Sequence, residues 1–231
     1  MKTTLLWLKL GLSAALLMSA TANLHAVTVG VDPGASWIGF MNVFELPSHG
    51  GAFAFNSVWA TADLDASFTG PTATITPNTS ISRDVPLTDT FWWQPSGEGN
   101  KNMDANFYVQ NDALAGQTVT FTGLVLGNSL VAPYTSTIFI KEFAGDFSSM
   151  IASTTTPVTP GIFSLTLPTI PGTHIQYGFE TLGPNARLDE VASFGFVQVT
   201  AVPEPSIAAL LIGGVLSFTG FSRRFRTHRE S

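Results

Sequence analysis

The fold class is decided by a stretch in which polar and apolar residues alternate, Gln117-Thr118-Val119-Thr120-Phe121-Thr122. Thr, Val and Phe at period two are typical of a strand with one face buried and the other in water. The same alternation recurs in Phe163-Ser164-Leu165-Thr166-Leu167 and in Ile175-Gln176-Tyr177-Gly178-Phe179. We therefore expect a sheet structure built from half-buried strands.

Further strands are expected outward from these three, in segments rich in aromatic, β-branched and Thr residues. The segments are 37–44, 53–60, 64–69, 90–94, 106–110, 136–143 and 193–200. Turn-forming residues separate them, as at Ser48-His49-Gly50-Gly51 and Pro171-Gly172. About ten short strands with frequent turns and no internal repeat predict an all-β domain, a β-sandwich of the jelly-roll type, over residues 27–201.

The first 26 residues have the layout of a secretory signal peptide. Lys2 and Lys9 precede an apolar run at 10–18, and small residues follow with plausible cleavage sites at 20–22 and 24–26. The run is too short for a permanent anchor. Since no twin-arginine motif is present, we expect export through the general secretion machinery.

The composition changes again after Thr200. The segment Val202, Pro203, Glu204, Pro205 is rigid, because proline fixes φ and disfavours helix in the residue before it. An apolar run at 207–221 follows, and its 15 residues would cover about 22 Å as a helix, against a hydrocarbon core of about 30 Å. We expect a marginal transmembrane helix.

A basic cluster follows this run, and basic residues beside a transmembrane helix mark the cytoplasmic side. The cluster contains Arg223, Arg224 and Arg226. Arginines at this position stop transfer through the membrane, so the domain before the helix is expected outside the cell, in agreement with the signal peptide.

The order of proline-rich motif, apolar helix, Arg cluster and chain end in residues 202–231 resembles the PEP-CTERM sorting domain of Gram-negative bacteria. The resemblance implies that an exosortase, a membrane-embedded cysteine transpeptidase, recognises Pro203-Glu204-Pro205 and removes the helix and basic tail. The protein would then cross the inner membrane, be anchored transiently, and end at the cell surface or outside the cell. A permanent single-span anchor is the alternative.

Charge and cysteine content exclude several function classes. The chain has a formal net charge of -6 and no cysteine. Residues 27–201 carry fourteen acidic side chains against four basic ones, too few cations to neutralise many phosphates, so we expect no nucleic-acid binding. The absence of cysteine excludes disulfides, thiolate catalysis and Cys-ligated zinc.

Residues 111–123 resemble a stretch of galactose-binding-like jelly rolls, in which a loop leads into a strand that faces the ligand side. Aromatic residues give the sequence's clearest indication of binding. Trp92 and Trp93 are adjacent in the expected strand 90–94, so one should face the core and the other outward, where its ring can stack on a sugar. The alternative is that the loop 95–100 covers the outward ring.

Two polar patterns are candidates for cation binding or catalysis. Asn100, Asn102 and Asp104 repeat at period two, an arrangement of oxygen ligands that suits Ca²⁺, although no EF-hand pattern follows; the alternative is a polar loop. Asp63 and Asp65 share a face of an expected strand, and paired carboxylates can serve as acid and base; the alternative is an exposed acidic edge.

No catalytic motif is present: neither a Gly-x-Ser-x-Gly elbow nor a His-Glu-x-x-His sequence occurs. We expect a non-enzymatic exported protein without a cofactor, whose domain associates with extracellular or envelope polysaccharide, since PEP-CTERM proteins resemble one another in this link. One alternative is a structural or adhesive surface protein that binds protein or itself. Another is a secreted glycan hydrolase, which needs two acids about 5 to 9.5 Å apart.

Overall fold

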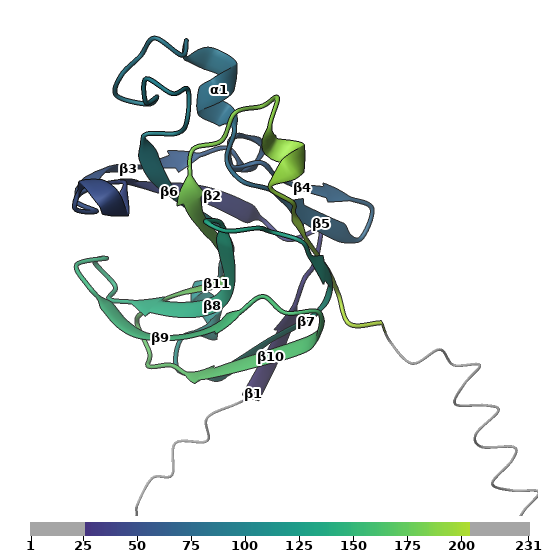
Figure 1. Ribbon diagram of the computed structural model, residues 1–231. Helices are drawn as coiled ribbons and strands as arrows, with labels where there is room; N and C mark the ends of the chain where they lie inside the picture. Colours follow the sequence, from purple (N-terminus) through teal and green to yellow (C-terminus); the bar gives the residue numbers. More distant parts are fainter. Residues whose placement is uncertain (1–25, 204–231) are drawn as a thin grey trace, which may run out of the picture.

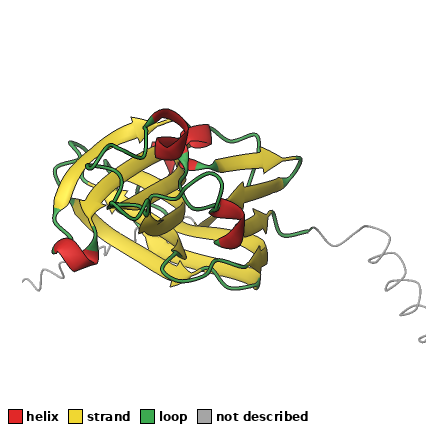
Figure 2. Cartoon of the chain, turned by 45° about the horizontal axis from the view of Figure 1, so that its top comes forward, coloured by secondary structure: helices red, strands yellow, loops and turns green. Residues whose placement is uncertain are grey.

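The computed structural model describes residues 26–203, which form two packed β-sheets with short helices only at the periphery (Figures 1 and 2). The expected all-β sandwich is therefore confirmed. The expected signal peptide, apart from Ala26 at the start of β1, and the expected sorting segment from Glu204 onward lie outside the described residues. Among residues 26–203, no helix has the length and apolar character needed to cross a membrane.

Each sheet has six strands. Sheet A contains β1 (Ala26–Gly30), β4 (Ala66–Thr69), β5 (Thr72–Ile75), β7 (Thr118–Asn128), β10 (Gly161–Pro168) and β12 (Val197–Thr200). Sheet B contains β2 (Trp37–Glu45), β3 (Phe53–Trp59), β6 (Lys101–Gln110), β8 (Thr135–Phe143), β9 (Met150–Pro157) and β11 (His174–Pro184). The helices are η1 (Pro47–His49), η2 (Thr61–Leu64), α1 (Ser80–Asp84), η3 (Asp112–Leu114) and η4 (Val191–Ser193).

The strands from β5 to β12 pair as one long hairpin that is rolled up. β5 pairs with β12, β6 with β11, β7 with β10 and β8 with β9, and all four pairs are antiparallel. Successive pairs alternate between the two sheets. β1 pairs in parallel with the first half of β7, and β12 pairs with the second half of the same edge of β7. The first and the last strand of the domain therefore both belong to sheet A.

Alternation along the strands places one set of side chains between the sheets. Phe121 of β7 and Phe179 of β11 are both fully buried, with ring centroids 5.7 Å apart, and Phe163 packs on both. Trp37 stacks on Phe107 at 4.3 Å. Offset aromatic contacts of this kind add to the burial of apolar surface that stabilises the sandwich.

The sequence prediction for residues 90–94 was wrong, because this segment turns instead of extending. The carbonyl of Asp89 accepts hydrogen bonds from the backbone N–H groups of Trp92 and Trp93, and the Asp89 carboxylate accepts from Phe91 N–H. Only one isolated bridge, from Trp93 to Gly99, remains. The local Asp89 bonds compete with a strand ladder and hold the segment as a loop.

Other boundaries differ from expectation. β6 begins at Lys101 and not at 106, so the polar loop considered for residues 100–106 is wrong: these residues are mostly in a strand. The sequence analysis missed β1, β5 and β9. The expected strand at 193–200 contains only β12, since η4 ends at Ser193.

Candidate ligand-binding groove

One face of β6 points away from the core and carries a row of polar and aromatic side chains. Met103, Ala105, Phe107 and Val109 of this strand are in the core. Because side chains alternate across a strand, their neighbours point to the outer face of sheet B. These outward residues are Asn102, Asp104, Asn106, Tyr108 and Gln110.

The outer face of sheet B is hollowed. Asn106, Tyr108 and Phe139 are only 5%, 7% and 1% exposed, although they point away from the core. Gly178 lies in register between Tyr108 and Phe139, and the two rings approach across it to 6.4 Å. A Cβ atom at Gly178 would lie 2.2 Å from the Phe107 carbonyl oxygen, so the close approach of β6 requires glycine.

Two cavities occupy this hollow, and we call them together the outer groove. The first has a volume of about 550 Å³ and the second about 510 Å³. Lining side chains of the first include Phe40, Asn42, Asn106, Tyr108, Gln110, Lys141, Phe143, Phe147 and Gln176. Those of the second include Phe44, Asn102, Asp104, Glu180 and Leu182.

A hydrogen-bonded ladder crosses the strands between the two cavities. Asp104 accepts from the amide of Asn42 at 2.9 Å and from the amide of Asn106 at 2.7 Å. Lys141 Nζ donates to Asn106 Oδ1 and to Glu180 Oε2, each at 2.8 Å. Donors and acceptors are thus held in fixed positions across four strands, β2, β6, β8 and β11.

The ladder contains two carboxylates in different environments. Burial and the nearby Glu180 carboxylate raise the pKa of Asp104, against the lowering effect of Asn42, Lys141 and Asn106. Glu180, in contrast, is ion-paired with Lys141. Burial disfavours the charged form of a carboxyl, which accounts for the raised pKa of Asp104.

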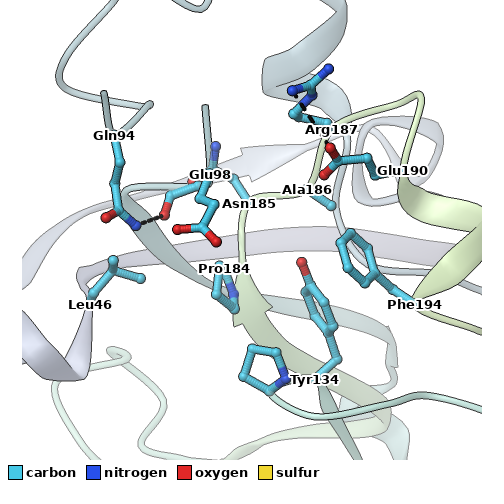
Figure 3. A pocket seen from close by; sticks show the side chains of 12 residues that line it. Leu46, Gln94, Glu98, Tyr134, Pro184, Asn185, Ala186, Arg187, Glu190 and Phe194 are labelled. Atoms are coloured by element: carbon cyan, nitrogen blue, oxygen red, sulfur yellow. Dashed lines mark hydrogen bonds and ion pairs between the residues drawn. The ribbon is translucent and has the colours of Figure 1, made fainter. Parts of the chain in front are cut away.

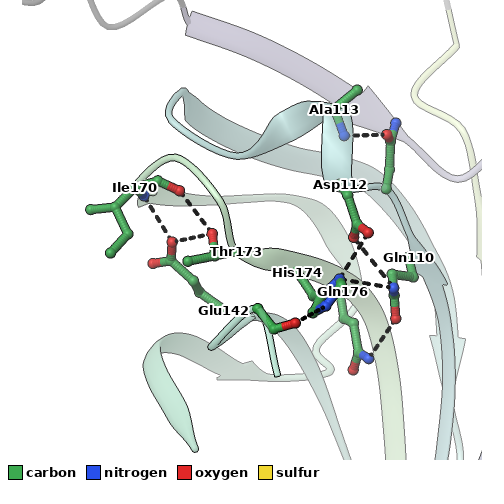
Figure 4. Close-up of polar contacts among 10 residues, drawn as sticks. Gln110, Asp112, Ala113, Glu142, Ile170, Thr173, His174 and Gln176 are labelled. Carbon is green, nitrogen blue, oxygen red and sulfur yellow. Dashed lines mark hydrogen bonds and ion pairs between the residues drawn. The ribbon is translucent and has the colours of Figure 1, made fainter. Parts of the chain in front are cut away.

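A histidine lies in a polar network with Asp112, Gln110 and Gln176 beside the groove residues (Figure 4). His174 Nδ1 lies 2.8 Å from Asp112 Oδ2, and its Nε2 lies 3.1 Å from the Gly145 carbonyl oxygen. Phe147, which lines the groove, stacks on the imidazole at 3.9 Å. The Asp112 hydrogen bond, and in smaller part the Gly145 carbonyl, raise the pKa of His174, and the ring links the loop between β8 and β9 to Asp112.

Glu142 stands beside this network but has a structural role (Figure 4). Its carboxylate is 1% exposed and accepts from the backbone N–H of Ile170 at 2.8 Å and from the Thr173 hydroxyl at 2.7 Å. It thereby satisfies donors of the turn between β10 and β11, as a buried carboxylate must.

The two tryptophans proposed from the sequence lie elsewhere. Trp93 is the core-facing one: it is 1% exposed, and its Nε1 has no hydrogen-bond partner within the described part of the chain. A sugar therefore cannot reach its ring. Trp92 is half-buried and packs edge-on against Phe55 and Phe91.

The expected oxygen ligands for calcium do not act as one set. Asn102 and Asp104 both line the groove, but the Asn100 amide donates to the carbonyls of Thr90 and Phe91. No group of three or more His, Cys, Asp or Glu side chains placed for a metal ion occurs in residues 26–203. Calcium binding at these residues stays a prediction.

The acid pair expected at Asp63 and Asp65 is not on a strand. Asp63 lies in η2, and Asp65 follows it in a left-handed conformation with φ of 56°. The Asp65 carboxylate is used internally: it pairs with Arg83 at 3.0 Å and accepts from the backbone and hydroxyl of Thr79. Asp65 therefore holds η2 against α1.

The segment expected to be a sorting motif begins directly after the sandwich. Val202 is half-buried and Pro203 is exposed, three residues beyond the end of β12. The remaining sorting residues lie outside the described part of the chain; they are Glu204, Pro205, Arg223, Arg224 and Arg226.

Comparisons of the chain with protein-family models, with curated proteins and with solved structures give no match. The candidate site therefore rests on geometry alone. Sequence reasoning missed Lys141 and Glu180, which join the ladder from β8 and β11. It also missed Tyr108, Gln110 and Gln176, although the period-two row of polar residues in β6 was a signal for this face.

Proposed function

We propose that this protein is an exported, non-enzymatic protein that binds extracellular or envelope polysaccharide in the outer groove of sheet B. The observation that carries the proposal is the combination in one hollowed face of aromatic rings, Phe40, Tyr108 and Phe143, with fixed amide, carboxylate and ammonium groups. Sugars offer the matching chemistry, since C–H faces pack on rings while hydroxyls both donate and accept hydrogen bonds.

The shape of the groove supports a chain-like ligand. The two cavities lie side by side over the same sheet, and together they exceed the size of a pocket for one small molecule. The polar ladder lies between them, so a ligand that fills both must pass over Asp104 and Asn106. A polymer that extends along the strands and over the ladder meets this requirement, whereas a single sugar would fill one half.

We also propose that the domain is a jelly roll. The support is the strand pairing, in which the hairpin from β5 to β12 is rolled so that successive pairs fall in alternate sheets. The jelly-roll resemblance of residues 111–123 agrees with this, because they include η3 and the start of β7. Fold alone does not decide function, since such sandwiches carry both binding modules and enzymes.

For delivery, we propose that the secretion machinery exports the chain and that an exosortase reads Val202-Pro203-Glu204-Pro205. In this account the C-terminal helix holds the protein in the inner membrane until the tail is removed, and the protein then remains at the cell surface or outside the cell. The position of Pro203 supports access, because this second residue of the motif is exposed next to the fold.

Nucleic acid is not a proposed partner. The four basic side chains of residues 26–203 each pair with a carboxylate, which leaves no free cationic patch on the described domain. The pairs are Arg83 with Asp65, Lys101 with Glu45, Lys141 with Glu180, and Arg187 with Asp189.

One observation favours glycan hydrolysis as a second candidate. Asp104 has a raised pKa and lies near Glu180, which is ion-paired with Lys141, and a carboxyl with a raised pKa beside a second carboxyl is the arrangement used by a general acid and its partner. Binding ranks first because both carboxylates are held in ladder hydrogen bonds.

Electrophoresis through gels that contain polysaccharide separates the two candidates. The exported protein should be retarded by the host's own extracellular polysaccharide, with no release of reducing ends. Release of reducing ends that is abolished by Asp104→Asn would establish hydrolysis instead. Unretarded migration in all polysaccharides would contradict the binding proposal.

A further inference from the structure

A second pocket, which shares no lining residue with the outer groove, lies at the end of the sandwich (Figure 3). Its volume is about 390 Å³, and it is formed by four segments far apart in the sequence: Leu46 directly after β2, the loop before β6, the loop before β8, and the end of β11 with the chain after it. We call it the end pocket. None of its residues takes part in the ladder of sheet B.

The end pocket is rigidly built. Asn185 joins the segments: its amide donates to the Trp92 carbonyl and its Oδ1 accepts from Lys101 N–H, both at 3.0 Å. Gly99 lies so close to Asn185 that a Cβ atom would be 2.0 Å from the Asn185 carbonyl oxygen. The walls are therefore fixed by backbone and amide contacts.

Tyr134 provides an unpartnered polar group in this pocket. The residue is 7% exposed, its ring lies against Gly183, and its ring centroid is 5.0 Å from that of Phe194. Within residues 26–203 no hydrogen bond satisfies its hydroxyl, which points into the pocket between Glu98 on one side and Glu190 on the other (Figure 3). The Tyr134 side chain is thus mostly buried, while its hydroxyl opens into the pocket without a partner in the described domain and is available to a ligand atom.

The charge in the end pocket is negative. Glu98 and Glu190 line it against a single guanidinium, that of Arg187. That guanidinium is engaged by Asp189 through Nε at 3.0 Å, and it reaches Glu190 only at 3.6 Å. Burial and the Glu190 charge raise the pKa of Tyr134 to about 12, in agreement with a negative potential at the hydroxyl.

We infer that the end pocket binds a small organic ammonium ion, with the cation between the rings of Tyr134 and Phe194 and the carboxylates of Glu98 and Glu190. Aromatic faces attract cations, and carboxylates in a partly enclosed site add to that attraction. The remaining lining, from Pro133, Pro184 and Ala186, is apolar and suits alkyl substituents. An anion would be repelled here, and a bare metal ion would find too few oxygen ligands.

The test is calorimetric titration of the exported protein with choline, using 3,3-dimethylbutan-1-ol as the neutral molecule of the same shape. We expect choline to bind at one site per chain, about tenfold more tightly than the neutral analogue. Glu190→Gln should weaken choline binding by a similar factor. Tyr134→Phe should weaken it by a smaller factor, because the ring and its packing remain.

Asp146→Asn, which removes an exposed carboxylate from the loop after β8, is the matched control and should leave choline binding unchanged. Equal affinity for choline and its neutral analogue would overturn the inference, as would choline binding that persists in Glu98→Gln/Glu190→Gln. Absence of choline binding to the folded wild type would also overturn it. Because the outer groove is not involved, failure here leaves the polysaccharide proposal intact.

Discussion

The Nζ atom of Lys141 lies 2.8 Å from the Oε2 atom of Glu180 on the outer face of sheet B. The two side chains are 17% and 25% exposed, so the pair is partly screened from water yet remains open to the groove. Charge-assisted hydrogen bonds hold both groups in place, and a ligand hydroxyl that meets them finds a donor and an acceptor already oriented.

Gly178 keeps the floor of the groove in place, because β6 approaches too closely for any side chain there. Gly178→Ala would place a Cβ atom 2.2 Å from the Phe107 carbonyl oxygen and 2.6 Å from Tyr108 Cα. We expect a loss of about 2 kcal/mol in the free energy of unfolding, measured by urea denaturation. Gly127→Ala is the matched control, since nothing lies within 4 Å of its added Cβ. Equal stability of the two variants would refute this reading of Gly178.

Asp104 should make the fold less stable at neutral pH than in acid. Since burial and Glu180 raise its pKa above the ordinary 3.8, the folded protein holds this proton more tightly than the unfolded chain does. The contribution of Asp104 to the free energy of unfolding therefore falls as the pH rises from 3.8 through the folded pKa.

The variant Asp104→Asn removes this effect. We expect it to raise the free energy of unfolding at pH 7 by on the order of 1 kcal/mol and to have no such effect at pH 3, where Asp104 is protonated in both states. Denaturation of both proteins across this range measures the difference. A variant that is less stable than the wild type at pH 7 would show that the ionised ladder stabilises the fold.

His174 should titrate above the ordinary value of 6.5, because Asp112 and the Gly145 carbonyl both favour the imidazolium. Its stabilising effect on the loop that carries Phe147 is present below pH 6.5 and is lost as the pH rises through the folded pKa. Following the imidazole protons by NMR measures this pKa. Asp112→Asn should lower it, whereas Asp84→Asn, on α1, should not; an unchanged pKa in Asp112→Asn would contradict the assigned cause.

The sorting proposal predicts a processed C-terminus. The mass of the mature protein recovered from the native host should correspond to a C-terminus at 203–206, and replacement of Pro203, Glu204 and Pro205 by alanine should leave the tail uncut. An intact chain that ends at Ser231 in the membrane fraction would instead indicate a permanent single-span anchor.

Sequence periodicity located those strands in which apolar and polar residues alternate strictly. β7, β10 and β11 were found in this way, because their inward residues are large and apolar. β9 was missed because its inward positions, such as Thr154, are small or polar. The aromatic run at 90–94 misled for the opposite reason: its hydrophobicity comes from Trp93, which fills the core from a loop that Asp89 folds back.

The candidate groove was beyond local sequence reasoning. Asn102 and Asp104 were singled out as possible ligands, and they do line it. Lys141 and Glu180, however, reach the same place only because β8 and β6 pair with opposite edges of β11, and such long-range pairing has no local signature. Trp92 and Trp93 were candidates because of their residue type, but Trp93 is buried in the core.

The most direct test of the central claim is the affinity for the host's extracellular polysaccharide of the wild type, of Phe40→Ala/Gln176→Ala in the groove, and of Trp92→Ala in the loop before β6. The account predicts that the groove variant loses about tenfold or more in affinity, because it removes a ring wall and a fixed amide. Trp92→Ala should bind as the wild type does. A loss confined to Trp92→Ala, with the groove variant unaffected, would contradict the account and place the binding surface on the loop.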